Sequence, residues 1–518
     1  MKGAATFSGR YARRDWIIAI VLIGIVFLLG LGQMTRGVPY WGDDSAAYLS
    51  EGIAIANGEL ADQAARNPML HPSSLPKEAQ SSDLVYVWGY PLFLSLVYKL
   101  VGFDTQSFTS IIYYKIPSLV CLSLLAGVLY LFFLRRFSRR ISAPLALIFC
   151  LTGNFIYTIN TLYSDVCFLF FSTLALLLIE LFLESETASA RGPSLPLGAV
   201  LGAVLWYTYE TRLNGIAICL TVLIAQLIYL LPRRASLRAP GRLLRHLLPY
   251  LLFIALRIVS ERLLLPPTPN MSDVGTTDLH KVIYYALYYG YFTLDYLNSL
   301  TGFPVYIGIL FCIPIFVGFF RDGFRRENLH LTLLFVGTYV INLTLPYGQR
   351  LRYLYSILPV MMLYLVFGAQ RILNWLAPRF RIQNRRSLGH RLAALLLIVV
   401  LASAAAADIR NLSAGGRPSE NDMYASDSVE MYRYIQENTA VDALIACVKP
   451  RAVYLNTGRM GYHAGYNGYK LLDADYYLYI ESDDFAEGNL ITEKIRDRFQ
   501  VEYATEHLTL YRITESAS

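Results

Sequence analysis

Two adjacent aspartates, Asp43 and Asp44, stand directly before a segment that has the pattern of an amphipathic helix ended by Asn57-Gly58. Neighbouring carboxylates at the mouth of a helical bundle are costly unless they are paired, bound to a cation or used in proton transfer. A carboxylate in this place can accept the proton of an attacking hydroxyl group. The alternative is that either residue only caps the helix, which is a common role of Asp at this position.

A third acid and three arginines lie at the ends of other apolar runs. Asp165 occurs in NTLYSDVCFLFF, Arg212 in YETRLNG, and Arg350 and Arg352 in YGQRLRY. Asp165 could orient Arg212, bind an acceptor or cap a helix. A guanidinium group can donate two parallel hydrogen bonds to a phosphate, so the arginines are candidate phosphate ligands. The structural alternative is pairing with Asp165, with Glu210 or with lipid head groups.

Four further residues are weaker candidates. Lys281 and His280 precede a tyrosine-rich segment and could also reach a phosphate, but a lysine at the boundary of a span usually extends its amino group to the membrane surface. His71 and His463 have no second ligand at a recognisable spacing, so no histidine-based metal site is predicted.

The composition is that of a membrane protein. Of 518 residues, 55% are hydrophobic and only 16% are charged, and the mean hydropathy is +0.41. Soluble domains carry about a quarter charged residues, so a soluble protein is excluded, and so are a disordered chain and a coiled coil. The net charge of +7 comes from short basic bursts between apolar runs. The bias of Lys and Arg toward cytoplasmic loops accounts for them, and nucleic-acid binding is not expected.

The apolar runs predict an all-α polytopic membrane domain of about eleven transmembrane helices. They fall at 16–34, 109–134, 141–160, 166–183, 197–209, 214–231, 247–265, 302–320, 330–345, 353–370 and 392–407. The tyrosine-rich segment 281–300 is also long enough to cross, but a twelfth span there would place two clusters of arginines outside, against the charge bias. We therefore expect it to lie in the membrane interface, with the N-terminus of the chain inside and the C-terminus outside.

This topology places the candidate residues on one side. A first external loop of about 35–108 contains the two aspartates and the segment GYPLFLSLVYKLVG, which is typical of a helix in the interface. Residues 1–407 form the membrane domain, and the tail 408–518 becomes rich in Asp, Glu, Tyr and Asn. We expect the tail to be a small extracytoplasmic α/β domain with a helix at EMYRYIQEN and strands at LIACV, AVYLN, YYLYI, VEYA and LTLYRI.

An ordered set of motifs across nearly the whole chain resembles the GT-C superfamily of membrane glycosyltransferases. The resemblance is greatest to bacterial members related to protein O-mannosyltransferases and aminoarabinose transferases. It is carried by an aromatic-Gly-Asp-Asp-Ser-x-x-Tyr loop after the first span, then GYPLFLSLVYKLVG, Asp165 in NTLYSDVCFLFF, YETRLNG, QRLRYLYSILPV and YIQENTAVDALIACVKPRAVYLNTGR. Many relatives have Asp-Glu where this chain has Asp43-Asp44. We favour Asp44 as the match of the family's catalytic acid, because Ser45 and Tyr48 follow it in the related Asp-Ser-x-x-Tyr form.

The resemblance implies a sugar donor on a polyprenyl phosphate, a hydroxyl-bearing acceptor and an active site that opens to the extracytoplasmic side of the cell membrane, the inner membrane of a bacterium. Transfer would be inverting, with Asp44 as general base and Asp43 beside it, and with Tyr48, Asp165 and the basic residues near the substrates. No cofactor is required in the lipid-monophosphate branch. The oligosaccharyltransferase branch allows a divalent cation, which Asp43, Asp44 and Asp165 could hold.

Two other classes of function compete with this one. A transporter or flippase of lipid-linked or amphipathic substrates usually has inverted repeats and acids at mid-membrane, whereas here the acids lie in a loop and no repeat is found. A membrane scaffold whose tail binds a partner would not need Asp44. The sequence identifies neither the sugar nor the acceptor, which could be an envelope glycan, a lipid or a protein.

Overall fold

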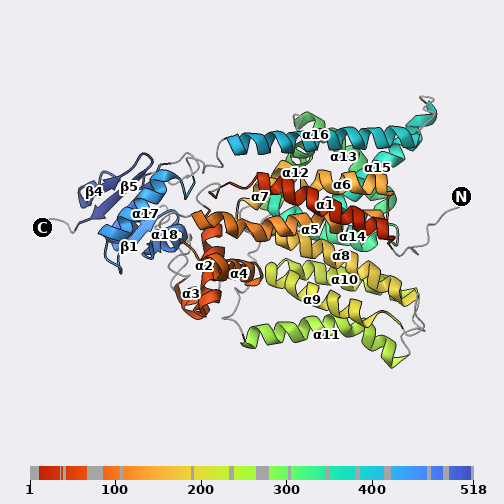
Figure 1. The fold of residues 1–518 in the computed structure, drawn as a ribbon, viewed down its shortest axis with the longest axis horizontal. Helices are drawn as coiled ribbons and strands as arrows, with labels where there is room; N and C mark the ends of the chain where they lie inside the picture. The colour runs from red at the N-terminus through yellow and green to blue at the C-terminus, as the bar shows by residue number, and fades with distance from the viewer. Residues whose placement is uncertain are drawn as a thin grey trace.

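The chain folds into a long helical part followed by a small part that contains a sheet (Figure 1). The computed structural model describes residues 11–35, 37–38, 42–66, 86–104, 109–187, 192–232, 239–263, 279–301, 305–344, 351–379, 385–413, 422–463, 468–481 and 489–514.

Six described helical segments are long and apolar enough to cross a membrane: Arg13–Gly32, Thr109–Leu134, Asp165–Glu186, Pro240–Arg262, Leu351–Arg379 and Ala394–Asn411. A seventh is formed if Arg139–Cys150 and Gly153–Ile159, which meet at 53°, are one broken span. The protein is therefore a multi-pass membrane protein. The count of eleven spans, their orientation and the interfacial position of 281–300 stay predictions.

The long bundle helices are α1 (Arg13–Gly32), α5 (Ile116–Leu134), α8 (Asp165–Thr187), α11 (Pro240–Leu263), α12 (Leu279–Thr301), α15 (Leu358–Arg379) and α16 (Arg385–Ser413). Between them lie α6 (Arg139–Cys150), α7 (Gly153–Ile159), α9 (Leu195–Thr211), α10 (Gly215–Leu230), α13 (Val305–Gly318) and α14 (Leu329–Thr344). Three short turns of 3-10 or π type extend them: η2 (Thr109–Lys115), η5 (Phe319–Gly323) and η6 (Leu351–Ile357).

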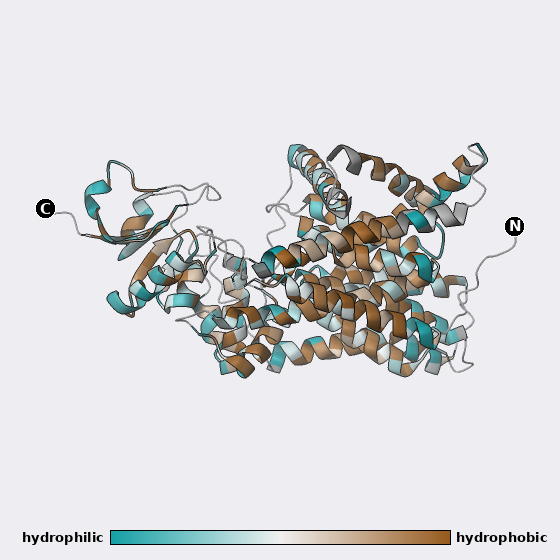
Figure 2. Ribbon diagram, turned by 45° about the horizontal axis from the view of Figure 1, so that its top comes forward, coloured by the Kyte–Doolittle hydropathy of each residue, from teal (hydrophilic) through white to brown (hydrophobic). Residues whose placement is uncertain are grey.

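Two helices form the centre of the bundle. In the most apolar 18-residue stretch of each segment, 83% is buried in α8 and 72% in Thr109–Leu134, which ends with α5. The corresponding share is only 17% in α11 and 11% in α16. A helix that is apolar on all sides is suited to such a central position. The outer helices expose apolar side chains instead, and the helical part is hydrophobic along its length with polar residues toward its ends (Figure 2). This pattern is what contact with lipid requires.

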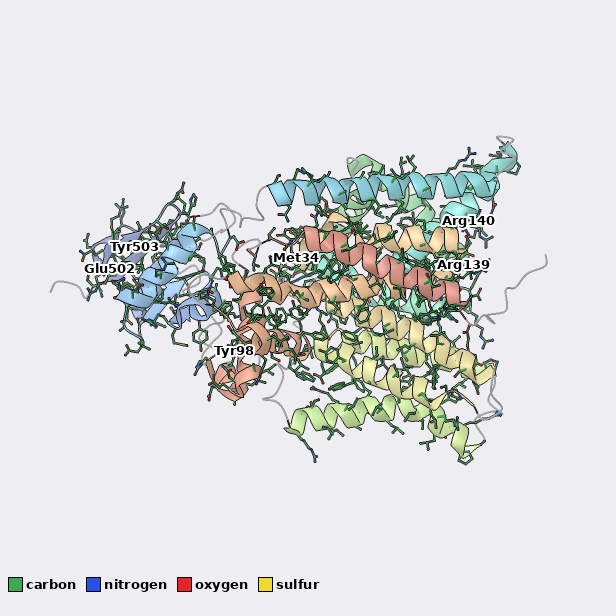
Figure 3. The ribbon with its side chains drawn as sticks, in the orientation of Figure 1. Met34, Tyr98, Arg139, Arg140, Glu502 and Tyr503 are labelled. Carbon is green, nitrogen blue, oxygen red and sulfur yellow. The ribbon has the colours of Figure 1, made fainter. Side chains whose placement is uncertain are left out.

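The two ends of the bundle differ. Arg139 and Arg140, from a loop that the sequence assigns to the cytoplasm, lie at the end far from Tyr503 of the C-terminal part (Figure 3). At that end Arg139 pairs with the buried carboxylate of Asp15 at the start of α1. The opposite end of the bundle therefore faces the C-terminal part, and the candidate residues are found there.

Three short helices lie between the bundle and the C-terminal part: α2 (Asp43–Asn57), α3 (Leu60–Arg66) and α4 (Gly89–Val101) (Figure 1). The predicted end of α2 is confirmed, because Gly58 follows it with φ +78°, a left-handed conformation that glycine adopts without strain. Helix α2 packs along α4 and also contacts α3.

That the C-terminal part forms a separate domain outside the membrane stays a prediction. It combines helices with a small mixed sheet. Its elements are α17 (Ser426–Asn438), β1 (Leu444–Cys447), α18 (Pro450–Thr457), β2 (Met460–Tyr462), η7 (Gly468–Asp473), β3 (Tyr476–Ile480), η8 (Arg496–Arg498), β4 (Phe499–Ala504) and β5 (Leu508–Ile513). The strand order is β2-β1-β3-β5-β4, with parallel pairing among the first three strands and antiparallel pairing of β3 with β5 and of β5 with β4.

One strand prediction in this domain is wrong. The segment AVYLN lies in helix α18, not in a strand, and the strand Met460–Tyr462 was not predicted. Pro450 occupies the start of the helix and Gly458 ends it with φ +71°. Proline at the start and glycine just past the end are the signals of a short helix, and they outweigh the β propensity of Val and Tyr. Helix α16, which was predicted as a span ending at residue 407, continues to Ser413.

Candidate active site

Asp44 lies in the first turn of α2, and its side chain does not cap the helix. The N-cap residue is Gly42, and the described residues make no side-chain cap hydrogen bond there. The hydroxyl of Tyr86 instead donates a hydrogen bond of 2.7 Å to Oδ1 of Asp44, and Nη2 of Arg352 donates one of 3.0 Å to Oδ2. The carboxylate therefore points toward an arginine that is 308 positions away in the sequence.

A second ion pair joins the other predicted acid to a predicted arginine. Asp165 is the first residue of α8, and Arg212 follows the last residue of α9. The guanidinium group of Arg212 pairs with Oδ1 of Asp165, and the side chains expose only 16% and 2% of their surfaces. The pairing that the sequence left open for Arg212 is thus with Asp165, while Glu210 pairs with Arg257 of α11.

The two ion pairs share one aromatic neighbour. The guanidinium carbons of Arg212 and Arg352 lie 5.6 Å and 5.5 Å from the ring centre of Tyr353. Arg352 also lies 5.1 Å from the ring centre of Tyr163, two positions before Asp165. The positive charge of Arg352 interacts with the carboxylates of both Asp44 and Asp165. We call Asp44, Asp165, Arg212 and Arg352 the charged cluster.

Arg352 keeps one donor free within the charged cluster. Its Nε is buried and has no hydrogen-bond acceptor among the residues that the structure describes. A buried N–H group without a partner costs about 1–3 kcal/mol, so native proteins rarely leave one unless a ligand or water completes it. The position of this donor, in an arginine that shares the ring of Tyr353 with Arg212, is suited to an anionic oxygen.

Tyr48 packs against Tyr86, the tyrosine that donates a hydrogen bond to Asp44. Its ring stacks on that of Tyr86, with 4.1 Å between the ring centres, and its hydroxyl lies 2.9 Å from the hydroxyl of Ser164. Because Ser164 directly precedes Asp165, Tyr48 connects the two acids of the charged cluster through two contacts. Residues 44 and 48 are one turn apart, so they share a face of α2.

The described parts of the segment predicted to be the first external loop are fixed to the bundle around these residues. The hydroxyl of Ser45 donates to the carbonyl oxygen of Thr161, next to the start of α8. Gly89 packs so closely on the backbone of Glu210 and Thr211 that a Cβ atom would overlap it, and Tyr207 donates a hydrogen bond of 2.6 Å to its carbonyl oxygen. The ends of α2, α4, α8 and α9 are thereby brought together at one point.

The electrostatic balance keeps Asp44 ionised. Burial by itself raises the pKa of this carboxyl, but the charge of Arg352 and the hydrogen bonds from Tyr86 and Arg352 outweigh it, so the pKa lies below its usual range. The pKa of Tyr86 is raised well above its usual value, first by burial and then by the neighbouring carboxylate. At neutral pH the pair is therefore an anionic Asp44 that accepts a hydrogen bond from a neutral phenol.

The structure brings some predicted residues together and leaves others apart. Asp44, Tyr48, Asp165, Arg212 and Arg352 meet at the charged cluster, whereas Lys281 and His280 are exposed at the start of α12. Arg350, His71 and the side chain of Asp43 lie outside the described residues.

Sequence reasoning missed Tyr86, Tyr163 and Tyr353. Their spacing has no chemical pattern, and only the closeness of Tyr163 to Asp165 and of Tyr353 to Arg352 along the chain could have drawn attention to two of them.

A metal ion has little to bind in the part of the chain that the structure describes. No group of three or more His, Cys, Asp or Glu side chains is placed to hold one there. Asp44 and Asp165 each have an arginine partner, which a divalent cation would have to displace. The donor set near the charged cluster is therefore better suited to anions than to cations.

Comparison with solved structures identifies the fold. Archaeal oligosaccharyltransferase AglB from Archaeoglobus fulgidus, in complex with an inhibitory peptide and a dolichol-phosphate, has a TM-score of 0.55 at 11% identity, over 89% of this chain and 69% of that one. ArnT from Cupriavidus metallidurans, bound to undecaprenyl phosphate, has a TM-score of 0.54 at 13% identity, over 98% of this chain and 99% of that one.

A second form of the Archaeoglobus fulgidus oligosaccharyltransferase, tethered to an acceptor peptide, gives a TM-score of 0.55 at 12% identity, over 96% of this chain and 74% of that one. The chain thus has the fold of the GT-C membrane glycosyltransferases, as its motifs predicted. No protein-family model matches the sequence, and comparison with curated proteins finds no similar sequence.

Proposed function

We propose that this protein is an integral-membrane glycosyltransferase that moves a sugar from a polyprenyl-phosphate donor to a hydroxyl group of an acceptor, on the extracytoplasmic side of the membrane. The observation that carries the proposal is the contact of the Asp44 carboxylate with Arg352, whose Nε is a buried donor without an acceptor among the described residues. A base for the acceptor and a cation for the leaving phosphate are thus adjacent. The fold supports the same class, because AglB and ArnT were solved with dolichol-phosphate and undecaprenyl phosphate.

The transfer requires one bond to form as another breaks. The acceptor oxygen attacks the anomeric carbon, and its proton passes to the carboxylate of Asp44. The bond from the anomeric carbon to the phosphate oxygen breaks, and its electron pair stays on the phosphate, which gains one negative charge. Attack opposite to the leaving group inverts the anomeric centre, and this single displacement needs only one base. A base positioned in this way contributes typically about 10²–10⁴-fold.

The arginines of the charged cluster stabilise the charge that develops on the phosphate. Arg352 has the free Nε, and Arg212 lies on the same aromatic ring of Tyr353. Fixed donors aimed at developing charge are usually the largest single contribution to such a reaction. Asp165 orients Arg212 through their ion pair. Asp43 stays a second candidate base, because it is adjacent to Asp44 in the sequence.

A direct assay tests the proposal. Purified protein is given a panel of radiolabelled polyprenyl-phosphate sugars together with envelope glycans, lipids and peptides as acceptors. We expect release of the polyprenyl phosphate with at least one donor, and loss of that release in Asp44→Asn. A transporter or flippase would move the labelled lipid across a vesicle membrane without breaking its sugar-phosphate bond, and that result would replace the proposal.

A further inference from the structure

The end of the bundle that faces the C-terminal part contains a fully buried lysine. Lys115 is the last residue of η2, directly before α5, and it lies close to the end of α1, where Met34 is found (Figure 3). Four oxygen atoms surround its ammonium group: the carbonyl and hydroxyl oxygens of Thr35 at 2.7 Å and 3.0 Å, the carbonyl oxygen of Gly37, and Oδ1 of Asn160 at 2.9 Å. Burying an ammonium group is costly unless acceptors replace its water. Lys115 thus binds the backbone that follows α1.

Asn160 holds the same backbone from a second direction. It is buried and is the C-cap residue of α7. Its Oδ1 accepts a hydrogen bond of 3.0 Å from the backbone N–H of Thr35, and its Nδ2 donates one of 3.0 Å to the carbonyl oxygen of Gln33, the C-cap residue of α1. Lys115 and Asn160, which we call the polar anchor, therefore join the end of α1, the start of α5 and the end of α7.

Residues 160–165 form the turn from α7 to α8, and this turn contacts both sides of the charged cluster. The carbonyl oxygen of Thr161 and the hydroxyl of Ser164 bond to two residues of α2, the helix that carries Asp44. At the last position of the turn, Asp165 forms the second ion pair of the charged cluster. One short turn therefore connects the candidate base with the candidate phosphate ligands.

The backbone of this turn is strained at its third residue. Leu162 is fully buried and has φ +50°, and no other non-glycine residue that the structure describes has a positive φ. The Cβ atom disfavours this left-handed conformation, so contacts on both sides must hold it. Strained residues of this kind gather at active sites. Here the polar anchor holds the turn before Leu162, and α8 holds it afterwards.

We propose, on the basis of the function proposed above, that Lys115 and Asn160 are positioning residues of the active site. They fix the turn 160–165 to the backbone after α1, so that the turn sets the distance from Asp44 to the arginines of the charged cluster. Transfer needs the base and the arginines at the same time, because the acceptor oxygen and the leaving phosphate lie on opposite sides of one anomeric carbon. A displacement of about 1 Å can cost about 10²-fold in rate.

Loss of the polar anchor should affect the two sides of the charged cluster unequally. Asn160 bonds to the backbone that leads toward α2, whereas Asp165 keeps its place at the start of α8 and its pairing with Arg212. Release of Asn160 therefore loosens the base and leaves the phosphate ligands in place. We expect the chemical step to slow while the donor still binds. A purely structural role would lower the amount of folded protein and leave the rate per folded molecule unchanged.

The first test does not depend on catalysis. Amide hydrogen exchange in the full-length protein is followed by mass spectrometry, and peptides from the first turns of α2 are compared. We expect these amides to exchange roughly tenfold faster in Asn160→Ala, because a looser turn makes local opening easier. The control is Asn328→Ala, since Asn328 is also buried but bonds to Arg136, near Arg139 at the far end of the bundle (Figure 3). Unchanged exchange in α2, or an equal change in the control, overturns the proposal.

The second test separates kcat from donor binding. We expect Asn160→Ala to lower kcat about 10- to 100-fold, while the Kd of polyprenyl phosphate changes by less than about threefold. Asn160→Asp keeps the acceptor oxygen for Lys115 and Thr35 and should recover most of the rate. Ser45→Ala removes another bond to the same turn, so its effect should not multiply with that of Asn160→Ala. A kcat per lipid-binding molecule equal to that of the wild type contradicts the proposal.

The two tests also distinguish this proposal from the proposed function. If the wild type transfers no sugar from any donor, the proposed function fails, while hydrogen exchange still decides the role of Asn160. If Asn160→Ala does not fold, Thr35→Val takes its place, because it removes only a hydroxyl that contacts both Lys115 and Asn160. We then expect a smaller increase in the exchange of α2, and exchange equal to that of the wild type overturns the proposal.

Discussion

The hydroxyl of Tyr86 donates a hydrogen bond of 2.7 Å to the carboxylate of Asp44, and the two residues lie 42 positions apart in the segment predicted to be the first external loop. The same carboxylate accepts a hydrogen bond from Arg352 of the bundle. Three segments that are distant in the sequence therefore meet at one carboxyl group. The carboxyl group at this junction is therefore ionised and lies beside the guanidinium group of Arg352.

Asp44→Asn should abolish transfer while leaving the donor bound. The amide has nearly the same shape but cannot take the proton of the acceptor, so we expect kcat to fall about 10²–10⁴-fold. Binding of polyprenyl phosphate, measured by native mass spectrometry, should change far less. Glu59→Gln is the control, because Glu59 is exposed just after α2. Full activity in Asp44→Asn would contradict the assignment of Asp44 as the base and would leave Asp43 as the candidate.

Tyr86→Phe should move the acid limb of the pH–rate profile. The hydrogen bond from Tyr86 is one of the interactions that hold the pKa of Asp44 below its usual value. Activity that needs the ionised carboxylate is present above this pKa and lost as the pH falls through it. Removing the hydroxyl raises the pKa, so the loss of kcat should begin at higher pH. Tyr98→Phe, in the last turns of α4, should leave the profile unchanged, and an unmoved limb in Tyr86→Phe would contradict this account.

Arg352→Gln should weaken the binding of the lipid phosphate and slow its departure as the leaving group. A hydrogen bond to a charged partner is worth about 1.5–3 kcal/mol, so we expect roughly a 10- to 100-fold rise in Kd for polyprenyl phosphate. Arg352→Lys should rescue little, since an ammonium group lacks the planar fork and the Nε donor. Arg262→Gln, at the exposed end of α11, serves as the control. Equal lipid binding in Arg352→Gln and the wild type would remove Arg352 from the phosphate site.

Chelation should leave the activity in place. Asp44 and Asp165 are neutralised by Arg352 and Arg212, so the charged cluster does not need a divalent cation to offset its acids. We expect the rate of transfer in EDTA to stay within about twofold of the untreated rate. Removal of a metal ion that stabilises the phosphate would lower the rate by more than this. The measurement is lipid phosphate release before and after dialysis. Loss of activity that Mg²⁺ or Mn²⁺ restores would establish a metal site.

Local features of the site and fold were predictable where the signal lay in a short segment. The end of α2 followed from Asn57-Gly58, and the strands β1, β3, β4 and β5 from short runs of residues that favour strands. The prediction for AVYLN was wrong because β propensity was weighed without Pro450 and Gly458. The candidate acids and arginines were chosen by type and by their place at the ends of apolar runs. Tyr86 could not be chosen, because nothing in its own segment marks it.

The sequence by itself determined that this is a multi-pass membrane protein with a small α/β tail, since apolar length and composition depend only on what each segment exposes to lipid or water. It also determined which residue types could act on a lipid-linked phosphate. Only the tertiary structure decided the partners, joining Asp44 to Arg352 and Asp165 to Arg212. The reason is that pairing energies depend on distances between side chains, and packing sets those distances among helices that lie far apart in the chain.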